Sequence, residues 1–369
     1  MNNKNFQTYF DCGFSKIRAG TFNKDDSSDY FCIESKFFSD YSDIDKEIQK
    51  IITYLEKNTN QYLRDVNLMI DSSKMLSIGI SVFKKIDGSK LRQDDIQFLI
   101  QEAKQQILKY YNNKHIAHII INNYKIDDID YSYLPFEKKC NFISLDIFFI
   151  CLPNEIINYF KLLFNKLDIS VNQIYCSSYA KSVNYIDNFS LEESISFIDV
   201  GFNKTTIISF IENKFTSLDI LLIGGNHITK DISKVLKIDL DQAENIKLNF
   251  DKNENFLMDA GFSIELLQKI VFARTEEILE ICAKSIKLNL NTAEHFKMIL
   301  TGGGSKILDN QYKDKILFSN DIDFLEETVE DICNSGFKLG MGLNNHEVLI
   351  IPKKQTKQGF FEKLFHLFK

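Results

Sequence analysis

The chain has 369 residues, of which 44% are hydrophobic and 26% are charged, a composition typical of a globular protein with two ordinary domains or one large one. Its formal net charge of −7 argues against a nucleic-acid-binding surface over the whole molecule. The longest uninterrupted apolar run, Ile147–Leu152, is far shorter than the ~20 residues that cross a bilayer.

The cysteines and the N-terminus indicate a reducing compartment. Seven cysteines are scattered without a C-x-x-C motif, so we expect neither a disulfide framework nor a zinc site. The first residues lack the charged start, apolar stretch and cleavage site of a signal peptide, so we do not expect export.

The first predicted elements form a β-hairpin. Strand-like runs at 7–12 and 17–22 flank the sequence DCGFSK at 11–16. The glycine lets the backbone approach a ligand closely, the N–H groups of the bend can bind phosphate oxygens, and the aspartate can hold a hydrated divalent cation. The alternative is an ordinary hairpin turn, in which Asp and Gly are favoured for their backbone conformations.

The next segment, 66–168, has an α/β pattern of its own. Strands are predicted at 66–71, 75–84, 117–124 and 142–151, and helices at 92–110 and 153–167. The segment is long enough for a small inserted subdomain. The alternative is that its strands complete the main sheet, and periodicity does not separate the two.

The same hairpin recurs in the second half of the chain. The sequence DVGFNK at 199–204 lies between strand-like runs at 194–200 and 205–211. Two such bends facing each other could bind one polyphosphate between two halves of the molecule.

Two glycine-containing motifs follow the second hairpin. In IGGNHITKDI at 223–232, Asn226 or Thr229 is placed to cap a helix, and AENIK at 243–247 places Glu244 and Lys247 on one helix face. LTGGGS at 300–305 has the pattern of a strand, a glycine turn and a helix start. Such a turn admits a ring or a sugar close to the backbone, although three glycines alone are weak evidence.

The C-terminus is predicted to be an amphipathic helix. On a helical wheel, the apolar residues of 359–369 form one continuous arc, and Glu362, Lys363, His366 and Lys369 form the other. The stretch from Lys353 onward is locally basic. Docking on the protein's own core is the alternative, but phenylalanines flanked by lysines are typical of a helix that lies on anionic lipid. The residues expected to contact the membrane are Phe360, Phe361, Lys363, Leu364, Phe365, Leu367 and Phe368.

In this order, these motifs resemble the ATP-binding core of the actin, sugar-kinase and heat-shock-chaperone superfamily, and within it the bacterial cell division family FtsA. The resemblance includes both D-x-G hairpins, the GG-x-x-x-T-x-D-I and AE-x-x-K motifs, R-T-E-E-I at 274–278 and the L-T-G-G-G turn. It implies an α/β, actin-like fold, which is a duplicated ribonuclease H-like fold with two lobes, and an inserted FtsA-type 1C subdomain.

The resemblance also implies a nucleotide site between the lobes, with ATP and Mg²⁺ as ligands. Asp11 and Asp199 would lie near the magnesium ion, and Glu244 and Lys247 near the ribose or base. No residue is predicted to be a catalytic base. The remaining residues implied to contact ATP are Gly13, Ser15, Lys16, Gly201, Thr205, Gly225, Gly302, Gly303 and Gly304.

The second hairpin departs from the family pattern D-I-G-G-G-T-T-D. Phe202, Asn203 and Lys204 stand where the family has two glycines, and Ile207 stands where it has an acid. Side chains at glycine positions obstruct the approach of the backbone to a ligand. We therefore expect ATPase activity to be weak or absent.

The resemblance divides the chain into subdomains. Residues 1–72 and 152–195, with part of 320–345, would form subdomain 1A; 73–151 the inserted 1C; 196–224 and 296–320 subdomain 2A; 225–295 subdomain 2B; 346–358 a linker; and 359–369 the membrane-targeting helix.

In function, the resemblance implies a scaffold of the bacterial division site, peripheral on the cytoplasmic side of the inner membrane. It would bind ATP, self-associate into filaments and anchor the FtsZ C-terminal tail, which would dock within 225–295. Other divisome proteins would bind the inserted subdomain, and no nucleic acid is expected. Two alternatives share the core: a PilM-like adaptor of type IV pilus assembly, and a sugar or acetate kinase.

Overall fold

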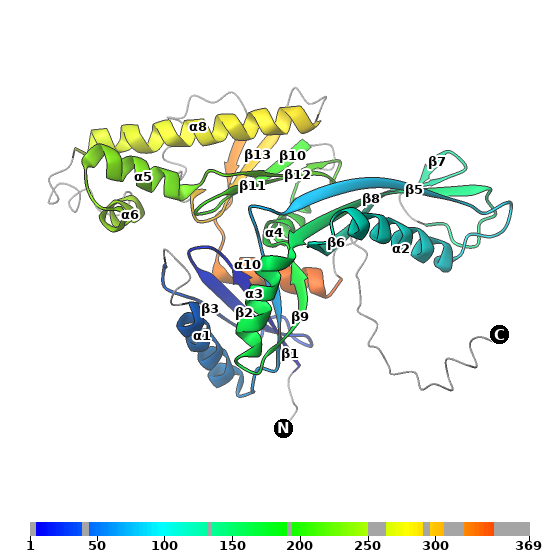
Figure 1. Ribbon diagram of the computed structural model, residues 1–369, viewed down its shortest axis with the longest axis horizontal. Helices are drawn as coiled ribbons and strands as arrows, with labels where there is room; N and C mark the ends of the chain where they lie inside the picture. Colours follow the sequence, from blue (N-terminus) through cyan, green and yellow to red (C-terminus); the bar gives the residue numbers. More distant parts are fainter. Residues whose placement is uncertain are drawn as a thin grey trace.

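The computed structural model describes residues 5–38, 44–131, 134–189, 194–249, 263–290, 296–305 and 321–342. The predicted linker at 346–358 and the predicted membrane helix at 359–369 lie outside these residues. The described strands form two five-stranded sheets and one four-stranded sheet. Figure 1 shows the two five-stranded sheets in separate lobes, with the third sheet projecting to one side.

The first lobe is built on the sheet of the N-terminal hairpin, in the order β3-β2-β1-β4-β9. β1 is antiparallel to β2 and parallel to β4. Thr8–Cys12 of β1 is buried throughout, because β1 is the central strand of the sheet and α1 and α10 pack on that sheet. The bounds are β1 (Phe6–Cys12), β2 (Ile17–Asn23), β3 (Tyr30–Glu34), β4 (Asp65–Ile70), β9 (Ser170–Tyr175), α1 (Ile44–Thr59) and α10 (Val329–Gly340).

The second lobe repeats this arrangement in the order β12-β11-β10-β13-β14, again with three antiparallel strands followed by two parallel ones. The duplication predicted from the two hairpins is therefore present in the strand order as well. The bounds are β10 (Ser194–Val200), β11 (Thr205–Ile211), β12 (Lys214–Leu221), β13 (Lys297–Thr301), β14 (Asp321–Phe324), α5 (Gly225–Leu236), α6 (Leu240–Leu248) and α8 (Ile264–Leu290).

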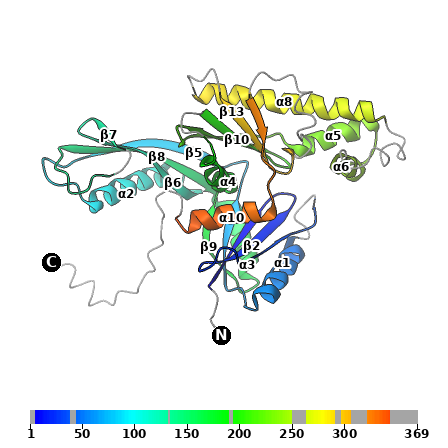
Figure 2. The same cartoon turned by 180° about the vertical axis from the view of Figure 1, so that it is seen from behind.

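The described part of 320–345, of which we expected a part in the first lobe, is divided between the two lobes. β14 pairs with β13 of the second sheet, whereas α10 packs on β1 and β2 of the first. The chain therefore crosses back between the lobes just before α10, as Figure 2 shows from behind.

The segment between β4 and β9 forms a separate antiparallel sheet in the order β5-β8-β6-β7. Its strands do not complete the main sheet, so the alternative that we considered for them is wrong. α2 covers one face with Leu99, Ala103 and Ile107 buried against it. The bounds are β5 (Leu76–Lys85), β6 (Lys114–Ile126), β7 (Ile129–Tyr131), β8 (Phe142–Pro153) and α2 (Gln93–Tyr110).

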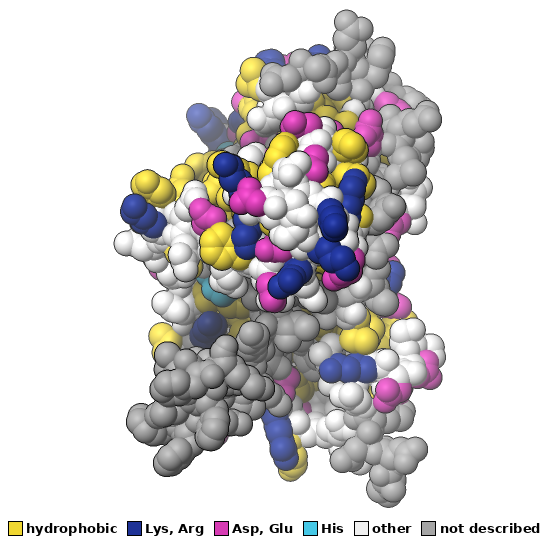
Figure 3. Space-filling model, turned by 90° about the vertical axis from the view of Figure 1, so that its right-hand side faces the viewer, with side chains coloured by type: hydrophobic (Ala, Val, Ile, Leu, Met, Phe, Trp, Pro, Cys, Tyr) yellow, Lys and Arg dark blue, Asp and Glu magenta, His cyan; other side chains and the backbone are white. Residues whose placement is uncertain are grey.

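Figure 3 looks onto the free end of this inserted sheet, where basic and acidic side chains are interspersed. Ion pairs join Lys84 to Asp95 and Lys90 to Glu137, each at 2.8 Å. Apolar side chains are exposed beside them, with Phe83 72% exposed. The end of the inserted sheet is therefore a mixed surface without a large field of one sign.

Two helices complete the first lobe, α3 (Asn154–Asn165) and α4 (Ser177–Ile186). α4 contacts β4 of the first sheet, β11 of the second and α10, so it lies at the junction of the lobes (Figure 1). Within the described ranges, no helix combines the length and apolar character needed to traverse a bilayer.

Candidate functional site

The tips of the two D-x-G hairpins meet at the junction of the lobes. The rings of Phe14 and Phe202 stack with centroids 6.0 Å apart and planes 12° from parallel. Phe37 meets the same Phe202 ring edge-on at 5.5 Å. The side chain that replaces a family glycine in the second hairpin therefore packs against the first hairpin.

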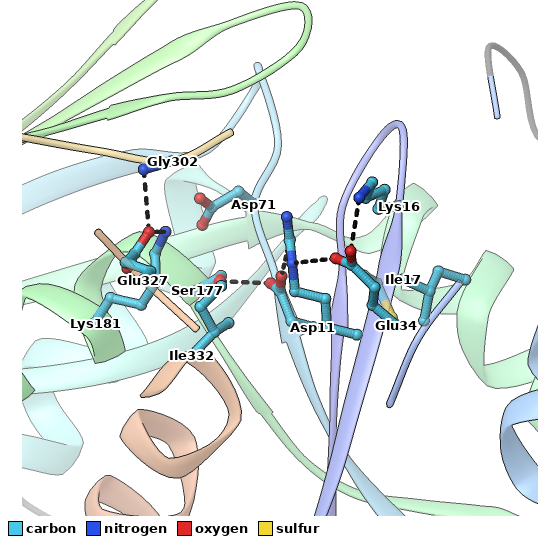
Figure 4. A network of polar contacts seen from close by, with 12 residues as sticks. Asp11, Lys16, Ile17, Glu34, Asp71, Ser177, Lys181, Gly302, Glu327 and Ile332 are labelled. Atoms are coloured by element: carbon cyan, nitrogen blue, oxygen red, sulfur yellow. Dashed lines mark hydrogen bonds and ion pairs between the residues drawn. The ribbon is translucent and has the colours of Figure 1, made fainter. Parts of the chain in front are cut away.

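Asp11 is paired within its own hairpin. It stands opposite Arg18 in the β1–β2 register, and Arg18 Nη1 lies 3.0 Å from Asp11 Oδ2. Burial by itself lowers the pKa of Arg18, but the charges of Asp11 and Glu34 outweigh it and raise that pKa. Lys16 pairs with Glu34 at 2.7 Å (Figure 4). Both charged residues predicted in the first hairpin thus have partners in the same sheet.

Asp199 is paired with a lysine that was not predicted as a site residue. Lys181 Nζ of α4 lies 2.7 Å from Asp199 Oδ2 and 3.3 Å from Glu327 Oε2. Burial raises the pKa of Asp199, but the Lys181 ammonium outweighs it and holds that pKa below its usual value. Burial raises the pKa of Glu327, with Lys181 opposing it in part. The three groups form one buried ionic cluster, of which Figure 4 shows Lys181 beside Glu327.

The first residues of α4 connect the acids of the two hairpins. The Ser177 hydroxyl donates to Asp11 Oδ1 at 2.6 Å, and the Ser178 hydroxyl lies 3.0 Å from Asp199 Oδ2. Ser178 also hydrogen bonds to Asp71, at the end of β4. Lys204 of the second hairpin reaches the same Asp71 carboxylate at 3.4 Å.

The predicted glycine turn at 302–304 packs on strand β10. Gly302 has a φ of +86°, a conformation that favours glycine, and its N–H donates to Glu327 at 3.0 Å. The Gly304 N–H donates to the Val200 carbonyl at 2.8 Å. A Cβ on Gly303 would meet no atom within 4 Å. Gly302 and Gly304 thus make close backbone contacts, and only Gly303 faces open space.

The start of α5 lies on the second hairpin. The N–H groups of Gly225 and Asn226 donate to the carbonyls of Gly201 and Phe202 at 2.9 and 2.7 Å. The helix begins after Gly224, so our prediction that Asn226 or Thr229 caps it is wrong. The reason is that the hairpin carbonyls accept the N–H groups that a capping side chain usually satisfies.

The charged pair predicted on α6 is present and buried. Lys247 Nζ lies 2.6 Å from Glu244 Oε2, 2.7 Å from Thr229 Oγ1 and 3.1 Å from the Gly225 carbonyl. Burial lowers the pKa of Lys247 despite the neighbouring Glu244 charge. The same ammonium lies 5.6 Å from the centre of the Phe202 ring.

The residues implied by the resemblance are therefore gathered at the junction of the lobes. Gly13 and Gly201 each sit in a tight bend, where an added Cβ would come within 2.9 Å of a carbonyl oxygen three residues on. The Ser15 carbonyl accepts from Phe38 N–H, and the Thr205 hydroxyl donates to the Ile223 carbonyl. Their role in binding ATP stays a prediction.

The residues present do not fit a Mg²⁺ ion in this arrangement. Magnesium takes about six oxygen ligands at ~2.0–2.1 Å, whereas Asp11 and Asp199 are paired with cationic side chains. In the part of the chain that is described, no three His, Cys, Asp or Glu side chains are grouped so that they could hold a metal. Every charged residue of the predicted nucleotide site has a partner within the protein: Asp11–Arg18, Lys16–Glu34, Asp199–Lys181 and Glu244–Lys247.

The two matching sheets and the helix between them define a chain with the actin-like ATPase fold. The PilM–PilN type IV pilus biogenesis complex superposes over 92% of this chain and 96% of its own, with a TM-score of 0.60 and 11% identity. The ethanolamine utilization protein EutJ from Carboxydothermus hydrogenoformans superposes over 90% and 88%, with a TM-score of 0.52 and 11% identity. At these identities the likeness shows the fold alone.

The sequence comparisons point to similarity with one family. A model of the cell division protein FtsA matches residues 196–262. FtsA of Buchnera aphidicola from Acyrthosiphon pisum is 24% identical over 319 residues, which cover 76% of this chain and 74% of that protein. FtsA of Agrobacterium fabrum is 20% identical over 74% of this chain and 66% of its own length. The chain is therefore similar to the FtsA cell division proteins, the family that its motifs resemble.

Proposed function

We propose that the chain is a cell division scaffold that self-associates and links FtsZ to the cytoplasmic face of the membrane. One observation carries this proposal, the similarity to FtsA along about three quarters of the chain. The actin-like fold supports it because such a fold offers two rigid lobes that can stack into filaments. The work proposed is attachment and assembly rather than catalysis.

The C-terminal helix is proposed to be the membrane contact. Its apolar arc would enter the interface while the neighbouring lysines face anionic lipid. A helix this short binds reversibly on its own, so an array of protomers would bind more firmly through linked sites. Self-association and membrane attachment would then reinforce each other.

The FtsZ tail is proposed to dock on the part of the second lobe that spans 225–295. In this range α5 and α6 expose three apolar side chains, Val235, Leu240 and Leu248, which are 49%, 50% and 52% exposed. Exposed apolar residues beside charged ones suit a short peptide with a mixed sequence. The inserted sheet, with its mixed surface, is proposed to contact other divisome proteins.

ATP and Mg²⁺ stay predictions of the family resemblance. A triphosphate would have to separate Phe14 from Phe202 and release Lys16 and Lys204 from their acidic partners. We therefore propose that the scaffold function does not require ATP hydrolysis. Titration of the purified protein with a fluorescent ATP analogue, in Mg²⁺ and in EDTA, tests whether the protein binds ATP and whether binding requires Mg²⁺.

A liposome experiment tests the membrane part of the proposal. The full chain should sediment with vesicles that contain anionic lipid, and a chain that lacks 359–369 should not. Phe98→Asp, which changes a phenylalanine 54% exposed on α2, is the matched control and should sediment like the full chain. Unchanged sedimentation of the shortened chain would contradict the proposal and favour a PilM-like adaptor, which shares the fold.

A peptide experiment tests the FtsZ part. A labelled peptide from the C-terminus of the same organism's FtsZ should bind the purified chain, and Val235→Asp with Leu248→Asp should weaken binding at least tenfold. Leu108→Asp, at a residue 43% exposed on the inserted subdomain, is the control. If the Val235→Asp, Leu248→Asp variant binds the peptide as tightly as the Leu108→Asp control, the proposed docking on α5 and α6 is contradicted.

A further inference from the structure

The carboxylates at the junction of the lobes are paired with cationic side chains of the protein itself. Lys181 is buried on α4, with 7% of its side chain exposed. It lies between Asp199, on a strand of the second lobe, and Glu327, just before α10 of the first. One ammonium group therefore contacts carboxylates from two separate parts of the chain.

Glu327 extends this cluster to the glycine turn. Besides Lys181, it accepts hydrogen bonds from the Tyr185 hydroxyl at 3.1 Å and from the Gly302 N–H at 3.0 Å. A buried carboxylate needs several donors to offset its loss of water. The turn that would face a nucleotide is thus bonded to a carboxylate that Lys181 neutralises.

Two further contacts between the lobes surround the cluster. Lys204 of the second lobe pairs with Asp71 of the first at 3.4 Å. The Phe14 and Phe202 rings stack between the hairpin tips. Charge pairs and aromatic rings thus lie beside the residues that the family resemblance assigned to Mg²⁺ and phosphate binding.

A divalent cation beside Asp199 would meet the Lys181 ammonium at a distance where two like charges repel strongly. The Asp199 Oδ2 oxygen already lies 2.7 Å from the Lys181 ammonium and 3.0 Å from the Ser178 hydroxyl, whereas Mg²⁺ prefers an octahedral shell of oxygen ligands. The disagreement between the Mg²⁺ that the family resemblance implies and this donor set rests on the position of Lys181.

We propose that Lys181 is a built-in cation that joins Asp199 to Glu327 and holds the lobes together without Mg²⁺ or a nucleotide. The two lobes are then joined by the protein's own side chains in the resting state of this chain. The proposal is tested on the purified protein alone, so the result does not depend on whether the chain acts in cell division.

Thermal unfolding followed by far-ultraviolet circular dichroism tests the proposal, since the chain has no tryptophan. Wild type should melt at the same temperature in EDTA, in MgCl₂ and in MgCl₂ with ATP. Lys181→Met should lower the melting temperature by about 5–10 °C in EDTA, because it leaves two buried carboxylates without a cation. MgCl₂ should restore part of this loss, because Mg²⁺ can then take the vacated position.

Two further variants separate a cationic role from a packing role. Lys181→Met combined with Asp199→Asn removes the excess negative charge, so its melting temperature should not respond to MgCl₂. Lys57→Met, at an exposed lysine near the end of α1, should melt like wild type in all three buffers.

Three results would overturn the proposal. They are a wild-type melting temperature that rises by several degrees only with Mg²⁺ and ATP, a Lys181→Met variant as stable as wild type, and a destabilised Lys181→Met variant that MgCl₂ does not rescue. If Lys181→Met does not fold, titration of the wild-type protein with a fluorescent ATP analogue tests the proposal instead. Binding that is tight in Mg²⁺ and lost in EDTA would overturn the proposal, and equal binding in both buffers would support it.

Discussion

Gly302→Ala tests whether the glycine turn serves packing within the protein. Gly302 has a φ of +86°, and a left-handed conformation costs an alanine about 1–2 kcal/mol. An added Cβ would also collide with the Asp199 carboxylate and lie 2.8 Å from the Val200 carbonyl oxygen. Moving a packed strand to relieve such overlap costs about 1–3 kcal/mol. We therefore expect the free energy of unfolding to fall by about 3 kcal/mol in total.

Urea unfolding followed by circular dichroism measures this loss, and the neighbouring glycine provides the control. Gly303→Ala meets no atom within 4 Å, so it should change the free energy of unfolding by less than about 0.5 kcal/mol. Equal effects of the two substitutions, or a Gly302→Ala variant as stable as wild type, would refute the packing described for this turn.

Three other predictions follow from contacts around the junction. In a double-mutant cycle of Phe14→Ala and Phe202→Ala, the stacked rings should give a coupling energy of about 1 kcal/mol in urea unfolding, and zero coupling would contradict the stacking. His118 is fully buried and its Nε2 accepts from the Cys176 N–H at 2.7 Å, so His118→Ala should lower the free energy of unfolding by about 3 kcal/mol. His118→Asn keeps a hydrogen-bond acceptor and should recover part of this loss. Equal losses in the two variants would argue against the hydrogen bond. Burial lowers the pKa of His115 from 6.5 to about 4, so the free energy of unfolding should fall by up to about 3 kcal/mol as the pH drops from 6.5 to 4. His115→Gln should remove that part of the pH dependence. A variant with the same pH profile as wild type would contradict the lowered pKa of His115.

The fold could be predicted from the sequence because its local patterns are strong. The second hairpin was expected at 194–200 and 205–211, and β10 and β11 have those bounds. Strand-like apolar runs on both sides of an Asp-x-Gly bend specify both strands and the turn, so little depends on distant contacts. The separate inserted sheet was left open, because periodicity does not reveal which strands pair with each other.

The ionic cluster could not be predicted in the same way, because its members are far apart in the chain. Lys181 and Glu327 are separated by 146 residues and meet because α4 and α10 pack against each other. α4 is buried along nearly its whole length, but its serines, lysine and asparagine do not reveal that burial in the sequence. The Asp11–Arg18 pair, in contrast, was within reach, since the hairpin register places the two residues opposite each other.

A distance measurement between the lobes tests most directly whether they stay together without a nucleotide. Spin labels on Tyr62→Cys in the first lobe and Leu288→Cys in the second would occupy positions that are 87% and 78% exposed, and pulsed electron paramagnetic resonance would report the distance between them. We expect one narrow distribution that is the same in EDTA and in Mg²⁺ with ATP. A broad distribution in EDTA that narrows or shifts when Mg²⁺ and ATP are added would contradict a junction held by the protein's own side chains.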